Sequence, residues 1–315
     1  MWSWLVRDLN LSESMRNSTV IEIGSRSQRT LASAVDVPGI GLITGARVNL
    51  RFCPASADAG LSFYRVDQRR PEPIPAIADM VTGTSRRTTL GRGAHSVTLV
   101  EHALAALNGM RIDNCRIELD GPEPPGLDGS ASRFVEALAL AGIVVQSARR
   151  GIWTVEQPLV IRHGNASIGF YPAQDDQLRL SYLLDYGPGA PIAPQAYTES
   201  VTPDSFQHRI AFARTFVLEE EAAGLQQQGV GRHLTAGELL VFGKHGLIEN
   251  RLRYANEPAR HKVLDLIGDL ALSGLQLAGR VVAYRSGHPL NVELARTLSQ
   301  MVGRNGNHTP LRLAA

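Results

Sequence analysis

The segment from Asn256 to Leu270, NEPARHKVLDLIGDL, places three polar side chains four residues apart within apolar sequence. On a helix such residues lie one above another, so His261, Asp265 and Asp269 would form a polar stripe. His261 and Asp265 could then present an imidazole nitrogen and a carboxylate oxygen to one metal ion. An exposed helical ion pair is the commoner explanation of that spacing. The prediction of a metal site therefore depends on a third ligand elsewhere in the chain.

The best candidate for that ligand is His102, in the segment TLVEHALAALNG. Two histidines and one carboxylate leave a coordination position open for water, which is the arrangement of catalytic zinc sites. Glu101 precedes His102 and could accept a proton from that water. Simpler explanations exist for both residues: His102 could be a hydrogen-bonded histidine at a helix start, and Thr98 to Glu101 has the pattern of a helix capping box.

His288 follows a glycine in the segment YRSGHPLN. A turn on a rigid scaffold can direct a side chain into a cleft, although a histidine on a surface loop would have the same sequence. Asp269 lies one helical turn beyond Asp265 and could keep His288 protonated, because a nearby carboxylate favours the imidazolium. This pair predicts a general acid.

The elements around these residues form two similar series. Strand-like segments, Val48 to Phe52 and Asn114 to Leu119, are accompanied by helical patterns that begin near Thr98 and Ser130 and end in glycines. A basic stretch at residues 147–151 precedes a second series, which ends in a strand, a turn and a helix from about Leu290. RFCPA at residues 51–55 is echoed by GFYPA at 169–173. Duplicated α/β halves facing each other would place His102 and His261 across one shared cleft.

Bulk composition limits the function classes. The length of 315 residues suits two domains, and a net charge of +2 with 20% charged residues gives no sign of a nucleic-acid surface. Cys53 and Cys115 lie in apolar runs, which favours reduced thiols and a cytoplasmic location. Residues 1–27 are interpreted as a polar extension without a signal sequence. No run approaches the roughly 20 apolar residues of a membrane helix, so any membrane contact is expected to be peripheral.

Several phrases of the sequence resemble one enzyme family. VEHALAALNGMRIDNCRIELDGPEPPGLDGSASRFVEAL, ARTF, RHKVLDLIGDL and SGHPLN occur in the order and spacing of the UDP-3-O-acyl-N-acetylglucosamine deacetylases, zinc amidases of lipid A biosynthesis. The likeness runs from Gln28 to about Leu294. It implies an α+β fold of two similar domains, each a small mostly antiparallel sheet packed by helices, with the active site between them. The expected division is an extension at 1–27, a first domain at 28–150 and a second at 151–315.

The resemblance also implies roles for individual residues, with a UDP-acylated amino sugar as the substrate. The expected zinc ligands are His102, His261 and Asp265. The expected general base is Glu101, and the expected general acid is His288, which Asp269 orients. Thr215 and Lys262 are expected at the scissile amide, and Phe216 is expected to border the sugar and acyl chain. Zinc and Glu101 would deliver hydroxide to the acetamide, and acetate and a free amine would leave.

The chain departs from the family pattern around these residues. Ile43 stands in GLITG where the family has a histidine, Val217 replaces a glycine after ARTF, and GRHLTAGELLVFG at 231–243 replaces a glycine-rich phrase. These changes leave every expected catalytic residue in place and affect the substrate's surroundings. The alternatives are a paralogue acting on another N-acyl amino sugar, a non-catalytic sugar-nucleotide or lipid-binding relative, and an iron(II) oxygenase with the same ligand set.

Overall fold

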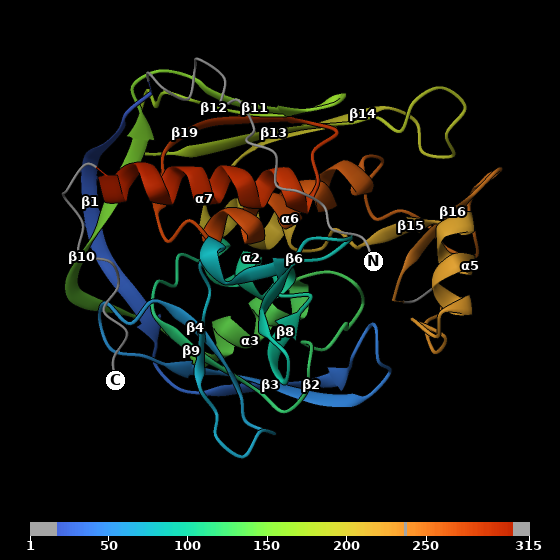
Figure 1. Cartoon of the computed structure of the whole chain (residues 1–315), viewed down its shortest axis with the longest axis horizontal. Coiled ribbons are helices and arrows are strands. Elements are labelled where there is room, and N and C mark those ends of the chain that lie inside the picture. The colour runs from blue at the N-terminus through green and yellow to red at the C-terminus, as the bar shows by residue number, and fades with distance from the viewer. Residues whose placement is uncertain (1–17, 236–237, 305–315) are drawn as a thin grey trace, which may run out of the picture.

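The computed structural model describes residues 18–235 and 238–304, and it contains two five-stranded sheets with helices between them (Figure 1). The sheet of the first half (residues 35–141) has the order β2-β3-β9-β4-β5. Its strands are β2 Val35–Ile40, β3 Arg47–Pro54, β9 Cys115–Leu119, β4 Leu61–Arg65 and β5 Pro73–Pro75. In β3 the alternating residues Val48, Leu50 and Phe52 are buried, as the apolar-polar alternation of the sequence predicts.

The sheet of the second half (residues 159–304) has the order β11-β12-β19-β13-β14. Its strands are β11 Leu159–His163, β12 Ala166–Tyr171, β19 Gly279–Tyr284, β13 Leu178–Leu184 and β14 Gln195–Ser200. In both sheets the third strand in spatial order pairs antiparallel with the second and parallel with the fourth. The echoed segments RFCPA and GFYPA end β3 and β12, the equivalent second strands, so the predicted duplication is confirmed.

Four helices fill the space between the sheets. They are α2 Glu101–Gly109, α3 Ser132–Ala141, α6 Glu257–Ala271 and α7 His288–Arg304. Figure 1 shows α6 and α7 under the sheet of the second half, and α2 and α3 over that of the first. The predicted α+β fold of two similar, mostly antiparallel units is therefore confirmed. The seam between the two helix layers is where side chains from both halves can meet.

The closest approach between these layers is that of α2 and α6. A Cβ atom added to Gly268 would lie 2.1 Å from the carbonyl oxygen of Glu101, so only glycine allows this crossing. Asn108 also donates a side-chain hydrogen bond to the carbonyl of Ile267, at 3.0 Å. The first and the last turn of α2 are thereby both held against the middle of α6.

A long ribbon joins the two halves at one side of the molecule. β1, Val20–Leu31, pairs antiparallel with β10, Ile143–Val155, and β10 pairs parallel with the short β18, Gln276–Leu277. Two expectations are thereby corrected. Residues 20–27 belong to β1 and not to an N-terminal extension, whereas residues 1–17 lie outside the described part. The basic stretch 147–151, at the expected boundary between the domains, lies inside β10, because the backbone of this stretch pairs with β1.

Each half also carries an insertion between the last strand before its central helix and that helix. The insertion lies between β5 and α2 in the first half and between β14 and α6 in the second. In the first half a short 3-10 helix, η1 Ala78–Met80, leads into the sheet β6-β7-β8, with strands Val81–Gly83, Thr89–Arg92 and His95–Thr98. In the second half α4 Pro203–Ser205 and the π-helix η2 Phe206–Ile210 precede β15 Phe216–Leu218, α5 Glu219–Gln227, β16 Leu240–Gly243 and β17 Gly246–Leu247. β7 and β8 bury Leu90 and Val97, whereas α5 buries no residue.

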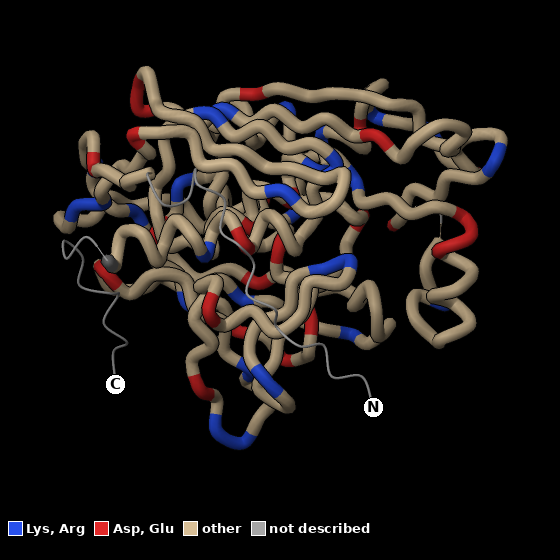
Figure 2. The backbone as a smooth tube through the Cα atoms, turned by 45° about the horizontal axis from the view of Figure 1, so that its top comes forward, with Lys and Arg blue, Asp and Glu red and all other residues tan. Residues whose placement is uncertain are grey.

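Charged residues are distributed over the molecule. Figure 2 shows basic and acidic residues interspersed along the visible chain. Within residues 18–235 and 238–304, no helix is both long and apolar enough to cross a bilayer.

Candidate metal centre and catalytic site

Three side chains from the two helix layers converge at the seam. His102 on α2 and His261 and Asp265 on α6 each bring one ligand atom within 4.8 Å of the others. The Nε2 atoms of His102 and His261 lie 3.6 and 3.3 Å from Asp265 Oδ1, and the two rings stand nearly perpendicular, at 89°. The structure thus brings together, from both halves, the three residues that the sequence analysis selected as ligands.

The chemistry of this group fits a divalent cation. Asp265 Oδ1 is buried and has no hydrogen-bond partner among the described residues, whereas Oδ2 accepts a hydrogen bond from Lys262 Nζ at 2.9 Å. A buried carboxylate oxygen without a partner is costly. Burial opposes ionisation, but His261 and Lys262 hold the pKa of Asp265 well below its usual value. Burial also lowers the pKa of His102, which favours the neutral imidazole that binds metals.

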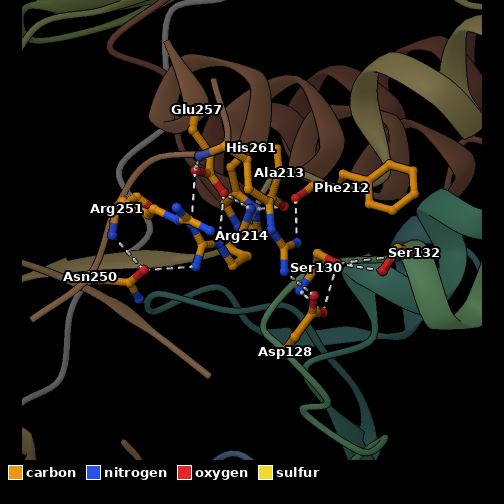
Figure 3. Close-up of polar contacts among 11 residues, drawn as sticks. Asp128, Ser130, Ser132, Phe212, Ala213, Arg214, Asn250, Arg251, Glu257 and His261 are labelled. Carbon is orange, nitrogen blue, oxygen red and sulfur yellow. Dashed lines mark hydrogen bonds and ion pairs between the residues drawn. The ribbon is translucent and has the colours of Figure 1, made fainter. Parts of the chain in front are cut away.

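A backbone contact orients His261 for such a role. Its Nδ1 lies 3.0 Å from the carbonyl oxygen of Ala213 (Figure 3). A carbonyl only accepts hydrogen bonds, so Nδ1 carries the proton and Nε2, which faces Asp265, is left with a free lone pair. An outer hydrogen bond of this kind fixes the tautomer and direction of metal-binding histidines.

A buried ion pair holds the segment that supplies this carbonyl. The guanidinium of Arg214 contacts both carboxylate oxygens of Glu257, the first residue of α6, at 2.8 and 3.1 Å. It also contacts Asn250 Oδ1 and the carbonyl of Arg251 (Figure 3). Glu257 is fully buried and Arg214 nearly so. The start of α6 is therefore tied to the Ala213 segment that orients His261.

Glu101 is the first residue of α2, and it does not cap the helix. The residue before the helix is Val100, which makes no side-chain capping bond, and Thr98 belongs to β8. The predicted capping box is therefore wrong, because the chain enters the helix directly from the β6-β7-β8 insertion. Instead, Glu101 Oε2 accepts a hydrogen bond from the amide of Thr88 at 3.1 Å. Burial, opposed by His288 and reinforced by Asp265, raises the pKa of Glu101 to about 7.

His288 and Asp269 meet beside Glu101. His288 begins α7, two residues earlier than expected, and its Nδ1 lies 2.8 Å from Asp269 Oδ2, while its Nε2 lies 3.9 Å from Glu101 Oε1. Asn291 donates a second hydrogen bond to Asp269 Oδ2, at 2.9 Å. Burial lowers the pKa of His288, but Asp269 outweighs that effect and raises it to about 9. An imidazolium and a carboxylate thus face each other next to the metal-binding group.

Phe216 and Lys262 contact this group, and Thr215 precedes Phe216 in the chain. The Phe216 ring lies 6.1 Å from the ring of His261, and Lys262 Nζ lies 5.3 Å from the Phe216 centroid. Burial alone would lower the pKa of Lys262, but the negative charge of Asp265 outweighs burial and holds the pKa above its usual value. The side chain therefore stays in the ammonium form. Half-buried Thr215 is held by its backbone, which donates to the carbonyl of Gly129 at 2.7 Å.

Sequence reasoning missed several residues of the site. Thr88 and Asn291 contact the acid–base pair, Arg214 and Glu257 anchor α6, and the Tyr186 ring lies 6.3 Å from that of Phe216. Arg214, Asn291 and Glu257 had a usable signal, because they lie inside the quoted phrases ARTF, SGHPLN and NEPARHKVLDLIGDL. Thr88 and Tyr186 come from segments whose pattern gives no sign of chemistry.

Two departures from the family pattern adjoin residues that reach the site, since Ile43 follows Leu42, which lines a small cavity with His102, and Val217 follows Phe216. The backbone amide of Ile43 donates to buried Glu123, and its carbonyl accepts from Gly231 of the other half, at 3.4 Å. Val217 is buried in β15 and pairs with Val241 of β16. Two residues of the 231–243 segment, 236 and 237, lie outside the described part.

Comparisons with known proteins agree on one family. The model of the UDP-3-O-acyl N-acetylglycosamine deacetylases matches residues 28–300. A UDP-3-O-acyl-N-acetylglucosamine deacetylase of Nostoc sp. is 41% identical over 276 residues, which cover 86% of this chain and 98% of the relative. The enzyme of that name from Anaeromyxobacter dehalogenans is 39% identical over 87% of this chain and 88% of its own. The Chlamydia pneumoniae enzyme is 36% identical over 87% and 97%.

Proposed function

This chain belongs to the UDP-3-O-acyl N-acetylglycosamine deacetylase family, and we propose that the seam between α2 and α6 is its active site. The reaction is removal of the acetyl group from UDP-3-O-acyl-N-acetylglucosamine, a step of lipid A biosynthesis. The observation that supports this location best is the convergence of His102, His261 and Asp265 around an unpaired carboxylate oxygen.

We propose zinc as the ion that these three residues hold. Two imidazoles and one carboxylate are a ligand set of hydrolytic zinc sites, and they leave a position open. Bound zinc would polarise the acetamide carbonyl and acidify water. Lys262 supports the set from the protein side, because it engages Asp265 Oδ2 and leaves Oδ1 facing both imidazoles.

Glu101 is proposed as the general base. Its carboxylate would take a proton from the water that attacks the acetamide carbon, and it lies one residue from the ligand His102. Burial raises its pKa to about 7, which keeps the carboxylate basic enough for this transfer near neutral pH. The amide of Thr88 holds the other carboxylate oxygen in place.

His288 is proposed as the general acid. The pKa of about 9 keeps the imidazole protonated at neutral pH, and Asp269 fixes its orientation. An imidazolium and the Thr215 hydroxyl can donate hydrogen bonds to the oxyanion that forms from the carbonyl. A proton from His288, or the one taken up by Glu101, then passes to the amine nitrogen as the carbon–nitrogen bond breaks. Water and amide are thus converted to acetate and a free amine.

The substrate's sugar and acyl chain are proposed to lie along Phe216 and the β15–β17 insertion. Phe216 packs edge-to-face on His261, so its ring borders the proposed metal site. The extents of the first and the second domain, and the cytoplasmic location, remain predictions.

A paralogue that acts on another N-acyl amino sugar is the second candidate. The substitutions at Ile43 and Val217 favour it, because they adjoin Leu42, which lines a small cavity with His102, and Phe216, which packs on His261. The proposed catalytic residues are intact. A non-catalytic relative would not need a buried base beside the ligands, and Glu101 is present. An oxygenase would require iron and oxygen, so a measurement of equal activity with and without air would argue against it.

The direct test is acetate release by the purified, zinc-loaded protein. It should be incubated with UDP-3-O-acyl-N-acetylglucosamine and, in parallel, with UDP-N-acetylglucosamine and free N-acetylglucosamine. We expect acetate to be released from the acylated nucleotide alone, or far faster from it than from the other two sugars. Faster release from another N-acetyl sugar would favour the paralogue, and no release from any substrate would contradict an enzymatic role.

A further inference from the structure

Thr88 lies at the point where the base and the acid come together. It is fully buried in the short segment that precedes β7, and it belongs to the first half. Its amide donates to Glu101 Oε2 at 3.1 Å, and its hydroxyl donates to Asp269 Oδ1 at 2.7 Å. The same hydroxyl oxygen lies 3.3 Å from His288 Nδ1. One residue therefore contacts all three groups of the proposed acid–base machinery.

We propose that Thr88 is a positioning residue, which holds the general base and the general acid at their working separation. This inference rests on the roles proposed for Glu101 and His288. The contacts cross the seam, because Glu101 comes from α2 whereas Asp269 and His288 come from α6 and α7. The amide of Val100 also donates to the Thr88 carbonyl, at 3.4 Å, so Thr88 is anchored to the start of α2.

The hydroxyl has a defined direction. A carboxylate oxygen accepts hydrogen bonds, so the single proton of the Thr88 hydroxyl points to Asp269 Oδ1. The lone pairs of Thr88 Oγ1 are then available to the proton on His288 Nδ1. This arrangement favours a protonated Nδ1 bonded to Asp269 and turns Nε2 toward Glu101 Oε1, 3.9 Å away.

The oxygen atoms of Asp269 show why the hydroxyl matters. Oδ2 accepts hydrogen bonds from His288 and Asn291, whereas the sole hydrogen bond to Oδ1 within residues 18–235 and 238–304 comes from Thr88. Asp269 is fully buried. Loss of the hydroxyl would leave a carboxylate oxygen unpaired and weaken the ionised form that supports the imidazolium. Glu101 and Asp265 also face His288 with negative charge, so only part of that support would be lost.

The variant Thr88→Val tests this role, because it keeps the amide and the branched shape and removes only the hydroxyl. In zinc-loaded protein we expect kcat to fall about tenfold with KM nearly unchanged. The basic limb of the pH–rate profile should shift to lower pH by about one unit, because a hydrogen bond to a charged group is lost. Thr88→Ser restores the hydroxyl and should restore both values. Thr30→Val is the matched control, since Thr30 is a buried threonine whose hydroxyl donates to the Asn114 carbonyl.

A measurement independent of turnover separates this inference from the proposed function. Nuclear magnetic resonance of protein labelled at the histidine ring nitrogens, with His288 assigned by comparison with His288→Gln, reports its titration directly. We expect a lower midpoint in Thr88→Val than in wild type, Thr88→Ser or Thr30→Val. An unchanged midpoint and unchanged kcat would overturn the positioning role. If wild type releases no acetate but the midpoint shifts, the proposed function fails and the role of Thr88 in placing His288 stands.

Discussion

The two halves of the molecule share one topology and contribute different chemistry. Their sheets have the same strand order, and α2 and α6 occupy equivalent places in the two halves. Yet α2 supplies one histidine and a buried glutamate, whereas α6 supplies a histidine and two aspartates. A repeated fold therefore guarantees that the two helices face each other, while the residues on each helix decide what the shared seam can do.

The ways in which the two helices are anchored differ as well. The start of α6 is tied by the buried pair Arg214–Glu257, at 2.8 Å. The start of α2 is held by the amide of Thr88 and by its close crossing at Gly268. The second half thus uses charge to place its ligands, and the first half uses backbone contacts. The following predictions test this division of roles, in order of decreasing effect on turnover.

Removal of a ligand from either half should have the largest effect. His102→Ala and His261→Ala should each lower zinc affinity by more than about 100-fold, because outer contacts alone are worth 10- to 100-fold. Turnover should be lost with the metal. Metal analysis after dialysis, with His163→Ala on the surface as the control, measures this. Full zinc retention by either variant would mean that only one half binds the ion.

Glu101→Gln should separate the two contributions of α2. The amide side chain has nearly the same shape but cannot accept a proton from water, so kcat should fall about 10²- to 10⁴-fold. The zinc content should stay at that of wild type, because His102 is untouched. A variant with unchanged kcat would remove Glu101 from the mechanism, and one without zinc would show a structural role in the metal site.

The pH dependence should report one group from each half. Activity needs ionised Glu101, so it should rise with pH through a pKa at or below about 7, since bound zinc lowers that value. Activity also needs protonated His288, so it should fall as pH passes about 9. His288→Ala should lower kcat about 100-fold and abolish the basic limb. If the basic limb persists, another group is the acid.

Glu257→Ala should have the smallest effect on turnover and act mainly on stability. It leaves the guanidinium of Arg214 buried without its partner, so the free energy of unfolding should fall by about 3–5 kcal/mol. Denaturant titration measures the change. Glu136→Ala, which breaks an exposed pair with Arg133, is the control and should leave stability nearly unchanged. Equal stability of both variants would show that α6 does not depend on its ion pair.

Local sequence pattern predicted those parts of the protein that depend on nearest neighbours. The four-residue spacing of His261, Asp265 and Asp269 predicted one helical face, and the structure has them on α6. Strand alternation predicted β3 and β9. The helical pattern after Thr98 and the glycine turn before His288 selected His102 and His288 as candidates, and the resemblance to the family supported that choice. Each of these signals is contained in a short stretch of chain, so it can be interpreted without knowing the fold.

Tertiary structure alone decided which distant segments meet. The capping box was a sound local pattern, but the β6-β7-β8 insertion placed Thr88 and not Thr98 against Glu101. Residues 20–27 were interpreted as part of an extension and 147–151 as the boundary between two domains, because each is too polar to predict a strand until it pairs with the other. A hydrogen bond between residues 181 positions apart, such as that of Thr88 to Asp269, leaves no periodicity in the sequence. It exists only because two helix layers pack closely enough for a buried hydroxyl to bridge them.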